Sequence, residues 1–122
     1  HIVDQDYVLN ARLFDMLIGD WDRHDDQWRW ATFKEDGKTL YRPIPRDRDQ
    51  AFFEFDGIFM NIANRKWAIR KFQPFSDDIR DLSGQNFNAR YFDRSFLIEG
   101  SREDWIRIAK KMQENLTDAV IK

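Results

Sequence analysis

The chain contains no cysteine and only two histidines, His1 and His24. The absence of cysteine excludes disulfide-stabilised scaffolds, thiolate zinc sites and cysteine nucleophiles. Two histidines are too few for an all-histidine metal site. A metal site in this chain would therefore depend on carboxylate and amide oxygens, which hard divalent cations prefer.

Long apolar runs and a strong net charge are also missing. No apolar run is long enough to span a bilayer, so the sequence predicts no membrane-spanning segment. The chain has 20 Lys and Arg against 22 Asp and Glu, and this formal charge of −2 gives no general attraction to nucleic acid or anionic membranes. Hydrophobic residues (42%) and aromatic residues (16%) suffice for a packed core, and 122 residues fit one domain.

The chain begins His1-Ile2-Val3, without an initiator methionine or a signal-like segment. We therefore expect residues 1–122 to form a single domain from a longer protein, with the neighbouring domains of that protein as partners. No internal repeat, low-complexity stretch or linker divides the sequence.

Charge is small in sum but unevenly distributed. Residues 1–26 contain seven Asp and two Arg, whereas residues 57–76 contain four cations and no acid. This pattern predicts one acidic site and a separate basic face. Four cations around a single aromatic, Trp67, form a modest patch, so a solvated face or a surface for an acidic or phosphorylated partner is favoured over nucleic-acid binding.

The hydrophobic pattern predicts a mainly α fold with one β-hairpin, an α+β class. Residues 4–18 carry an apolar stripe at helical spacing (Tyr7, Ala11, Phe14 and Ile18), and Gly19 ends this helix. A second stripe follows the capping-box sequence of residues 101–104, and it is expected to lie in the core or against a neighbouring domain. This stripe consists of Trp105, Ile108, Ala109, Met112 and Leu116. Short helices are predicted at 56–64 and 77–82.

The hairpin is predicted from aromatic and β-branched residues after the loop at 20–27. Its strands are expected at 28–33 and 40–44, around a turn at 34–38. The two prolines of the second strand, Pro43 and Pro45, restrict that strand to an edge or an end. Pairing of these strands places residue 27 roughly opposite residue 46.

This pairing gathers acidic residues at one end of the hairpin. It brings Asp47 and Asp49 beside the loop residues Asp22, Asp25, Asp26 and Gln27. Such a cluster is costly unless cations neutralise it. Two interpretations stay open on composition and spacing alone. The acids hold a divalent metal with a phosphate, or they form a structural salt-bridge network with Arg23, Arg46 and Arg48.

The same two segments resemble motifs of atypical protein kinases. Residues 17–24, L-I-G-D-W-D-R-H, are followed by Gln27 and resemble the I-G-N-x-D-R-H-x-x-N catalytic loop of the HipA-type toxin kinases, the CotH spore-coat kinases and the secretory-pathway casein kinases. Residues 44–52, I-P-R-D-R-D-Q-A-F, resemble the segment that carries the metal-binding Asp in those families. CotH proteins have a similar P-W-D-x-D-x-x-F run after a short hairpin. The chain also resembles a domain of long bacterial envelope proteins that contain metallophosphoesterase and outer-membrane barrel segments.

The resemblance implies the C-terminal lobe of an atypical kinase and assigns roles to four residues. Asp22 matches the catalytic Asp that orients or deprotonates the substrate hydroxyl. Gln27 falls where the second metal-binding Asn sits, and Asp47 falls on the metal-binding Asp, with Asp49 as a second candidate. The implied cofactors are Mg²⁺ or Mn²⁺ and ATP, and the implied acceptor is an unidentified protein or small molecule.

Some features depart from the kinase pattern. The extra methylene of Gln27, compared with Asn, weakens an octahedral Mg²⁺ site, and Asp20 stands where the families have Asn. The five glycines form no phosphate-binding loop, and no ATP-pairing Lys is evident. Those parts belong to an N-terminal lobe that would precede His1, so the chain alone is expected to be inactive. The sequence thus predicts a kinase-like phosphotransferase domain or its inactive remnant. The alternative is a non-catalytic accessory domain of a multidomain bacterial envelope protein, in the periplasm or outer membrane.

Overall fold

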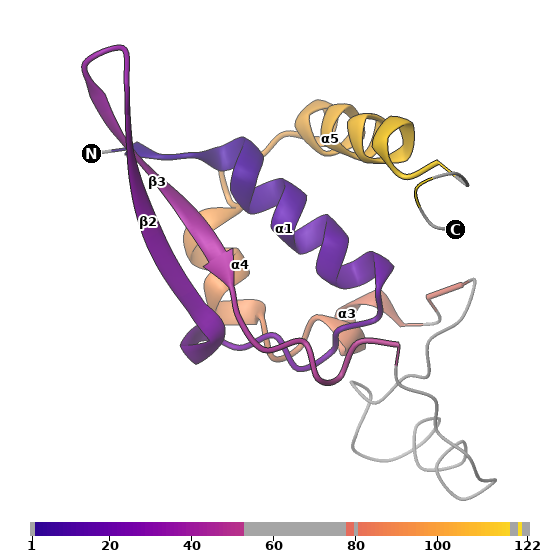
Figure 1. Ribbon diagram of the computed structural model, residues 1–122. Helices are drawn as coiled ribbons and strands as arrows, with labels where there is room; N and C mark the ends of the chain where they lie inside the picture. The colour runs from indigo at the N-terminus through magenta and orange to yellow at the C-terminus, as the bar shows by residue number, and fades with distance from the viewer. Residues whose placement is uncertain (1, 53–77, 80, 118–119, 121–122) are drawn as a thin grey trace, which may run out of the picture.

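The computed structural model describes residues 2–52, 78–79, 81–117 and 120, which form an α+β fold (Figure 1). Its elements in chain order are β1 (Ile2–Val3), α1 (Gln5–Leu17), the 3-10 helix η1 (Asp25–Gln27), β2 (Trp28–Glu35), β3 (Lys38–Pro45), α3 (Leu82–Gln85), α4 (Arg90–Phe96) and α5 (Arg102–Asn115). The predicted α+β class is confirmed. The helix predicted at 56–64 and the basic segment at 65–71 lie outside the described residues. Among the helices that the structure describes, none has the length and apolarity needed to cross a bilayer.

Helix α1 follows its sequence signals closely. The carboxylate of Asp4 caps its first turn by accepting the backbone N–H of Tyr7 at 3.4 Å. The helix ends at Leu17, and Gly19 then adopts a left-handed φ of 69°, which glycine tolerates without steric cost. The predicted helix at 4–18 is therefore confirmed to within one residue at each end.

The buried face of α1 differs from the predicted stripe. Ala11 and Ile18 are buried as expected, but the Tyr7 side chain is 48% exposed. The buried residues of the helix are Val8, Leu9, Ala11, Arg12 and Asp15. Two of these five are charged, so hydrophobic periodicity alone does not identify the face of α1 that enters the core.

Strands β2 and β3 form the predicted hairpin with a tighter turn. Asp36 and Gly37 both have positive φ values, 48° and 72°, as a two-residue type I′ turn requires. The strands therefore extend to Glu35 and Lys38, and the predicted five-residue turn at 34–38 is wrong. The predicted register is confirmed, because the backbone N–H of Arg46 donates to the carbonyl of Gln27 at 2.8 Å.

The sheet has the order β1-β3-β2, so β3 is its central strand. β1 is short and pairs in parallel with Leu40 and Tyr41 only. Pro43 and Pro45 lie beyond this pairing, in the half of β3 that bonds to β2 alone. Their missing N–H groups would point away from β2, because N–H direction alternates along a strand and Arg46 donates toward it. Both prolines are thus accommodated without loss of a ladder hydrogen bond.

The core lies where α1, the hairpin and α4 meet. Trp28 of β2 stacks on Phe92 of α4 with ring centroids 4.0 Å apart and planes 7° apart. Val8 and Ala11 of α1 complete this cluster. Helix α1 lies between the hairpin and α5 and packs against β3 and α5 (Figure 1).

The C-terminal part confirms one sequence signal and corrects another. Ser101 and Asp104 form the predicted capping box at the start of α5, and Ile108 from the predicted stripe is buried. The short helix predicted at 77–82 is wrong, because the described residues 78, 79 and 81 are not helical and α3 begins at Leu82. Asp81 accepts the N–H of Gly84 at 3.0 Å and so acts as the residue before the helix, not as part of it.

Candidate functional site

The two motif segments lie next to each other at the base of the hairpin. The N–H of Arg46 donates to the carbonyl of Gln27, and the guanidinium of Arg23 donates through Nη1 to the carbonyl of Arg46. At the far end, the N–H of Phe52 donates to the carbonyl of Ile18 at 2.8 Å. The segment from Ile18 to Gln27 is therefore bonded to the segment after β3 by three hydrogen bonds.

A buried carboxylate, Asp15 of α1, anchors both segments. Its side chain is 0% exposed. Arg23 donates to it through Nε at 3.0 Å and Nη2 at 3.1 Å, and Arg12 donates through Nη1 at 3.0 Å. Arg48 reaches the same carboxylate through Nη2 at 3.4 Å. Three guanidinium groups thus meet at one carboxylate.

Two further carboxylates balance these cations. Asp20 accepts from Arg23 Nη2 at 2.7 Å. Asp93 of α4 accepts from Arg12 through Nε at 2.6 Å and Nη2 at 3.2 Å. The network therefore joins three Arg and three Asp, and a buried charge network is tolerated only when its members are paired in this way.

Burial changes the pKa of two carboxylates of this network, Asp20 and Asp93. Burial raises the pKa of Asp20, and the neighbouring Arg23 opposes this rise. Burial likewise raises the pKa of Asp93, opposed by its hydrogen bonds from Arg12. In both cases the loss of hydration outweighs the attraction of the paired guanidinium.

Some of the predicted site residues share a pocket of about 440 Å³ at the base of the hairpin. The pocket is lined by His24, Asp26, Gln27, Arg46 and Asp47. It brings Gln27 from the first motif together with Asp47 from the second. Asp22 and Asp49 do not line it.

Asp22 and Asp49 have other surroundings. Asp22 is half-buried, and its Oδ1 accepts from Nδ2 of Asn88, just before α4, at 2.6 Å. Asp49 is exposed and accepts from the side chain of Gln50 at 3.1 Å. Among the described residues, a partner distant in sequence is found for Asp22 but not for Asp49.

The pocket fits a divalent metal only in part. Asp47 is exposed with a left-handed φ of 55°, and Asp26 is a second exposed carboxylate in the lining. The amide oxygen of Gln27 faces Arg23 Nη1 at 3.4 Å. Within the described ranges, no group of three or more His, Asp or Glu side chains is arranged to hold a metal. Within the described residues, the lining therefore offers at most two carboxylates, those of Asp26 and Asp47, to a cation.

The sequence correctly suggested that arginines neutralise acids here, but it named the wrong acids. Arg23 pairs with Asp15 and Asp20, and Arg48 pairs with Asp15, so neither pairs with the acids at the end of the hairpin. Arg46 forms no ion pair with any residue that the structure describes. Sequence reasoning missed Asp15, Arg12 and Asp93. The available signal was the pairing of Arg12 with Asp15 at i,i+3 on the face that also carries Val8.

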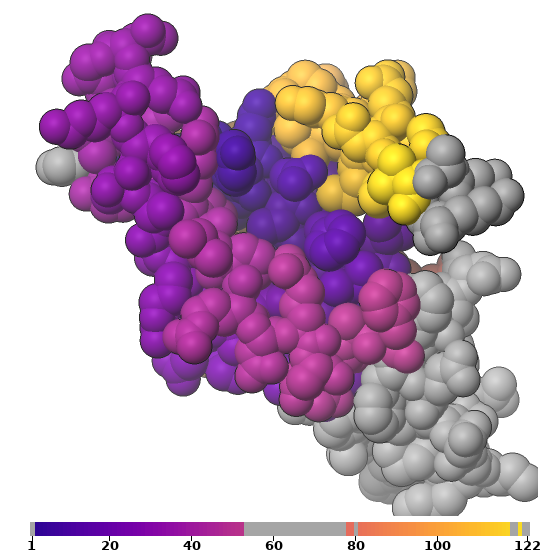
Figure 2. Space-filling model, in the orientation of Figure 1, coloured from indigo at the N-terminus to yellow at the C-terminus, as the bar shows by residue number. Residues whose placement is uncertain are grey.

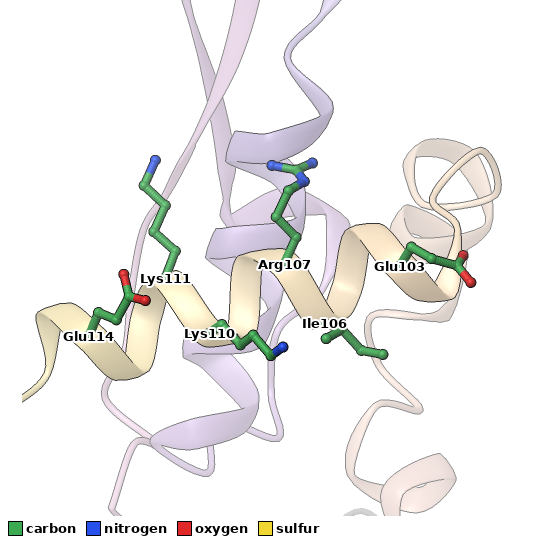
Figure 3. Close-up of a pocket in the computed structure, with 6 residues that line it drawn as sticks. All are labelled: Glu103, Ile106, Arg107, Lys110, Lys111 and Glu114. Carbon is green, nitrogen blue, oxygen red and sulfur yellow. The ribbon is translucent and has the colours of Figure 1, made fainter.

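A second hollow lies on the outer face of α5 (Figure 3). All its lining residues come from this one helix: Glu103, Ile106, Arg107, Lys110, Lys111 and Glu114. Arg107 is engaged by Asp6 of α1 at 2.7 and 2.8 Å. Acids and bases mixed along one exposed helix face are typical of a solvated surface, so we assign no site here.

Comparisons with protein-family models, with curated proteins and with solved structures find no match to this chain.

Proposed function

We propose that the chain is a kinase-like phosphotransferase domain whose metal and phosphate side is the pocket between residues 24–27 and 46–47. One observation supports this proposal above the others. Gln27 and Asp47, the residues that match the two metal-binding positions of the motifs, line one pocket although a whole hairpin separates them. Phosphoryl transfer depends mainly on positioning and on neutralising the phosphoryl oxygens, and such a pocket serves both.

Three of the five lining residues have a chemical role in this proposal. Asp47 and the amide of Gln27 would bind Mg²⁺ or Mn²⁺, which when bound neutralises charge on the phosphates of ATP. Arg46, exposed at the pocket, can donate to phosphate oxygens. Asp49, two residues after Asp47 and outside the pocket, remains the less favoured metal ligand.

Asp22 is the proposed catalytic carboxylate. The hydrogen bond from Asn88 holds its Oδ1 at 2.6 Å and so orients the side chain. A carboxylate fixed by one oxygen can accept the proton of a substrate hydroxyl at the other. Asn88 acts through Asp22 and is therefore a positioning residue.

The proposal is tested by thermal melts with and without millimolar Mn²⁺, alone and with ATP. A ligand that binds only the folded state raises the melting temperature, and a domain of this size gains about 4 °C per kcal/mol of binding free energy. We expect a rise for the natural chain that Asp47→Asn abolishes. Asp36→Asn is the matched control, because Asp36 is also an exposed Asp with a left-handed φ but lies at the opposite end of the hairpin. Equal rises for both variants, or no rise in the natural chain, would contradict a metal site at Asp47.

A second function is favoured by one specific contact. The amide oxygen of Gln27 accepts from Arg23, which belongs to the buried ion network, so Gln27 already has a structural partner. This contact fits a non-catalytic accessory domain of a larger bacterial envelope protein, in which the acids and arginines serve stability. Under this alternative, neither Mn²⁺ nor ATP changes the melting temperature.

A further inference from the structure

Strand β2 is an edge strand with an accessible outer side. In the sheet order β1-β3-β2, only β3 pairs with it, and no described strand borders its other edge. The hairpin tip projects past the helices (Figure 1), and the space-filling view shows it standing out from the body of the molecule (Figure 2). Unpaired edges of this kind are templates for pairing with another strand.

The register defines which backbone groups point outward. Arg46 bonds to Gln27, and inward-pointing residues alternate with outward-pointing ones along β2. The inward series starts at Gln27 and includes Arg29 and Glu35. The outward series consists of Trp28, Trp30, Thr32 and Lys34.

At one end of this outward series, the backbone groups of Trp28 already have hydrogen-bond partners within the chain. The N–H of Trp28 donates to the carbonyl of Asp25, and its carbonyl accepts from Arg29 Nη1 at 3.0 Å. The outward groups for which the described part of the chain offers no partner belong to Trp30, Thr32 and Lys34, all of which have exposed side chains. This free stretch is symmetric about Thr32.

We infer that β2 pairs with β2 of a second copy of this chain, antiparallel and about a two-fold axis at Thr32. In this register Thr32 faces Thr32 of the second copy, and Trp30 faces Lys34. All the outward groups of the free stretch are then bonded, and the two three-stranded sheets join into one of six strands. The inference is independent of the proposed phosphotransfer function.

Charge complementarity selects this register. With Thr32 on the axis, Arg29 lies opposite Glu35 of the second copy, and the pair occurs twice by symmetry. Opposite charges directly across an antiparallel pair stabilise it. Glu35 also binds Arg42 of its own chain at 2.8 Å, but its side chain stays 52% exposed and can accept a second guanidinium.

Neighbouring registers lack this complementarity. Moving the axis one residue toward Trp28 places Arg29 opposite Phe33 and brings the satisfied Trp28 into the pairing. Moving it one residue toward Glu35 places Glu35 opposite Ala31. In the inferred register Lys34 lies opposite an aromatic ring, where its ammonium group is attracted by cation–π interaction and not repelled by another Lys.

The absence of cysteine in the chain permits a direct test by single-thiol cross-linking. Thr32→Cys places two thiols across the axis with Cα atoms about 5.5 Å apart, which is within disulfide range. Lys34→Cys is the matched control, because its exposed thiol lies in the same outward series but about 14 Å along the strand from its counterpart. We expect mild oxidation to give a covalent dimer of Thr32→Cys and none of Lys34→Cys.

Sedimentation of the natural chain and two charge variants provides the second test. We expect a reversible dimer whose dissociation constant rises at least about tenfold in Arg29→Glu, because both ion pairs become repulsions. Arg29→Glu combined with Glu35→Arg restores the complementarity and the dimer. A melting curve of each variant verifies that the monomer is folded.

The opposite results would overturn the inference. These are a natural chain that stays monomeric at millimolar concentration, equal cross-linking of the two cysteine variants, or an Arg29→Glu chain that dimerises as well as the natural one. A dimer that the charge swap fails to restore would also reject this register.

Discussion

The guanidinium of Arg23 and the carboxylate of Asp15 form a two-point ion pair in the interior of the protein, with the closest contacts at 3.0 and 3.1 Å. The two side chains are 1% and 0% exposed. This parallel arrangement is the strongest geometry available to an Arg–carboxylate pair. Because Arg23 also bonds to the carbonyl of Arg46, the pair connects α1 to both segments of the candidate site.

Removal of Arg23 should therefore be strongly destabilising. Arg23→Met leaves Asp15 and Asp20 with less counter-charge in the interior, and breaking a buried pair from one side costs about 3–5 kcal/mol. The measurement is the free energy of unfolding in urea. Arg94→Met is the control on an exposed Arg of α4, and it should change stability by less than about 0.5 kcal/mol. Similar losses for the two variants would contradict the central position of Arg23.

The raised pKa values of Asp20 and Asp93 predict a specific dependence of stability on pH. A carboxyl whose pKa is higher in the folded state binds its proton more tightly there than in the unfolded chain. Its contribution is fully present below the ordinary carboxyl pKa of 3.8 and is lost as pH rises through the folded value. The free energy of unfolding, measured between pH 4 and neutrality, should thus decline less steeply with pH in Asp20→Asn than in the natural chain. An unchanged slope would contradict the assignment for Asp20.

The surface pair between Arg107 and Asp6 should give stability the opposite dependence on pH. Both side chains are about half exposed, and the hydrogen bonds from Arg107 lower the pKa of Asp6. The stability that Asp6 contributes is present above the ordinary carboxyl pKa and is lost as the pH falls through the folded value.

We expect Arg107→Met to cause a change in melting temperature far smaller than that of Arg23→Met. Added salt should remove the difference between Arg107→Met and the natural chain. A large, salt-insensitive loss would contradict this expectation.

The capping box of α5 should contribute measurably to stability. Ser101 accepts the N–H of Asp104 at 3.1 Å, and Asp104 accepts the N–H of Ser101 at 3.0 Å. Ser101→Ala removes the first bond and should cost about 1 kcal/mol. Ser101→Asp retains a capping carboxylate and should recover most of this loss in the same urea titration. Equal losses for the two substitutions would argue against a capping role.

The hairpin and its register could be predicted because both depend on local information. The Asp36-Gly37 pair specifies a two-residue turn, and the turn fixes which residues face each other. The predicted turn at 34–38 was too long but surrounds the same pair, so the predicted register was still correct. The meeting of Gln27 and Asp47 followed from this register alone. The helix predicted at 77–82 began too early, because that prediction did not use the capping preference of Asp81. Asp81 caps α3, which begins at the next residue.

The charge network could not be predicted by the same reasoning. Hydrophobic periodicity assumes that charged residues remain exposed to solvent. It therefore placed Tyr7 on the buried face of α1 and overlooked Arg12. The burial of Arg12 depends on Asp93, which is 81 residues away in the chain. No local pattern reveals such a partner, and the salt-bridge hypothesis consequently paired the arginines with the nearest acids.

The 81-residue separation of Arg12 and Asp93 affects how the chain folds during synthesis. The helix and hairpin of the first 45 residues emerge from the ribosome well before Asp93. Until then the only carboxylate partner of Arg12 in the network is Asp15, which also forms ion pairs with Arg23 and Arg48. Before residue 93 is made, only Asp15 and Asp20 can pair with the three arginines of the network, so Arg12 cannot yet be buried as a fully paired ion. Because α4 carries both Asp93 and Phe92, we expect the pairing of Arg12 and the closure of the core to occur together once α4 has been made.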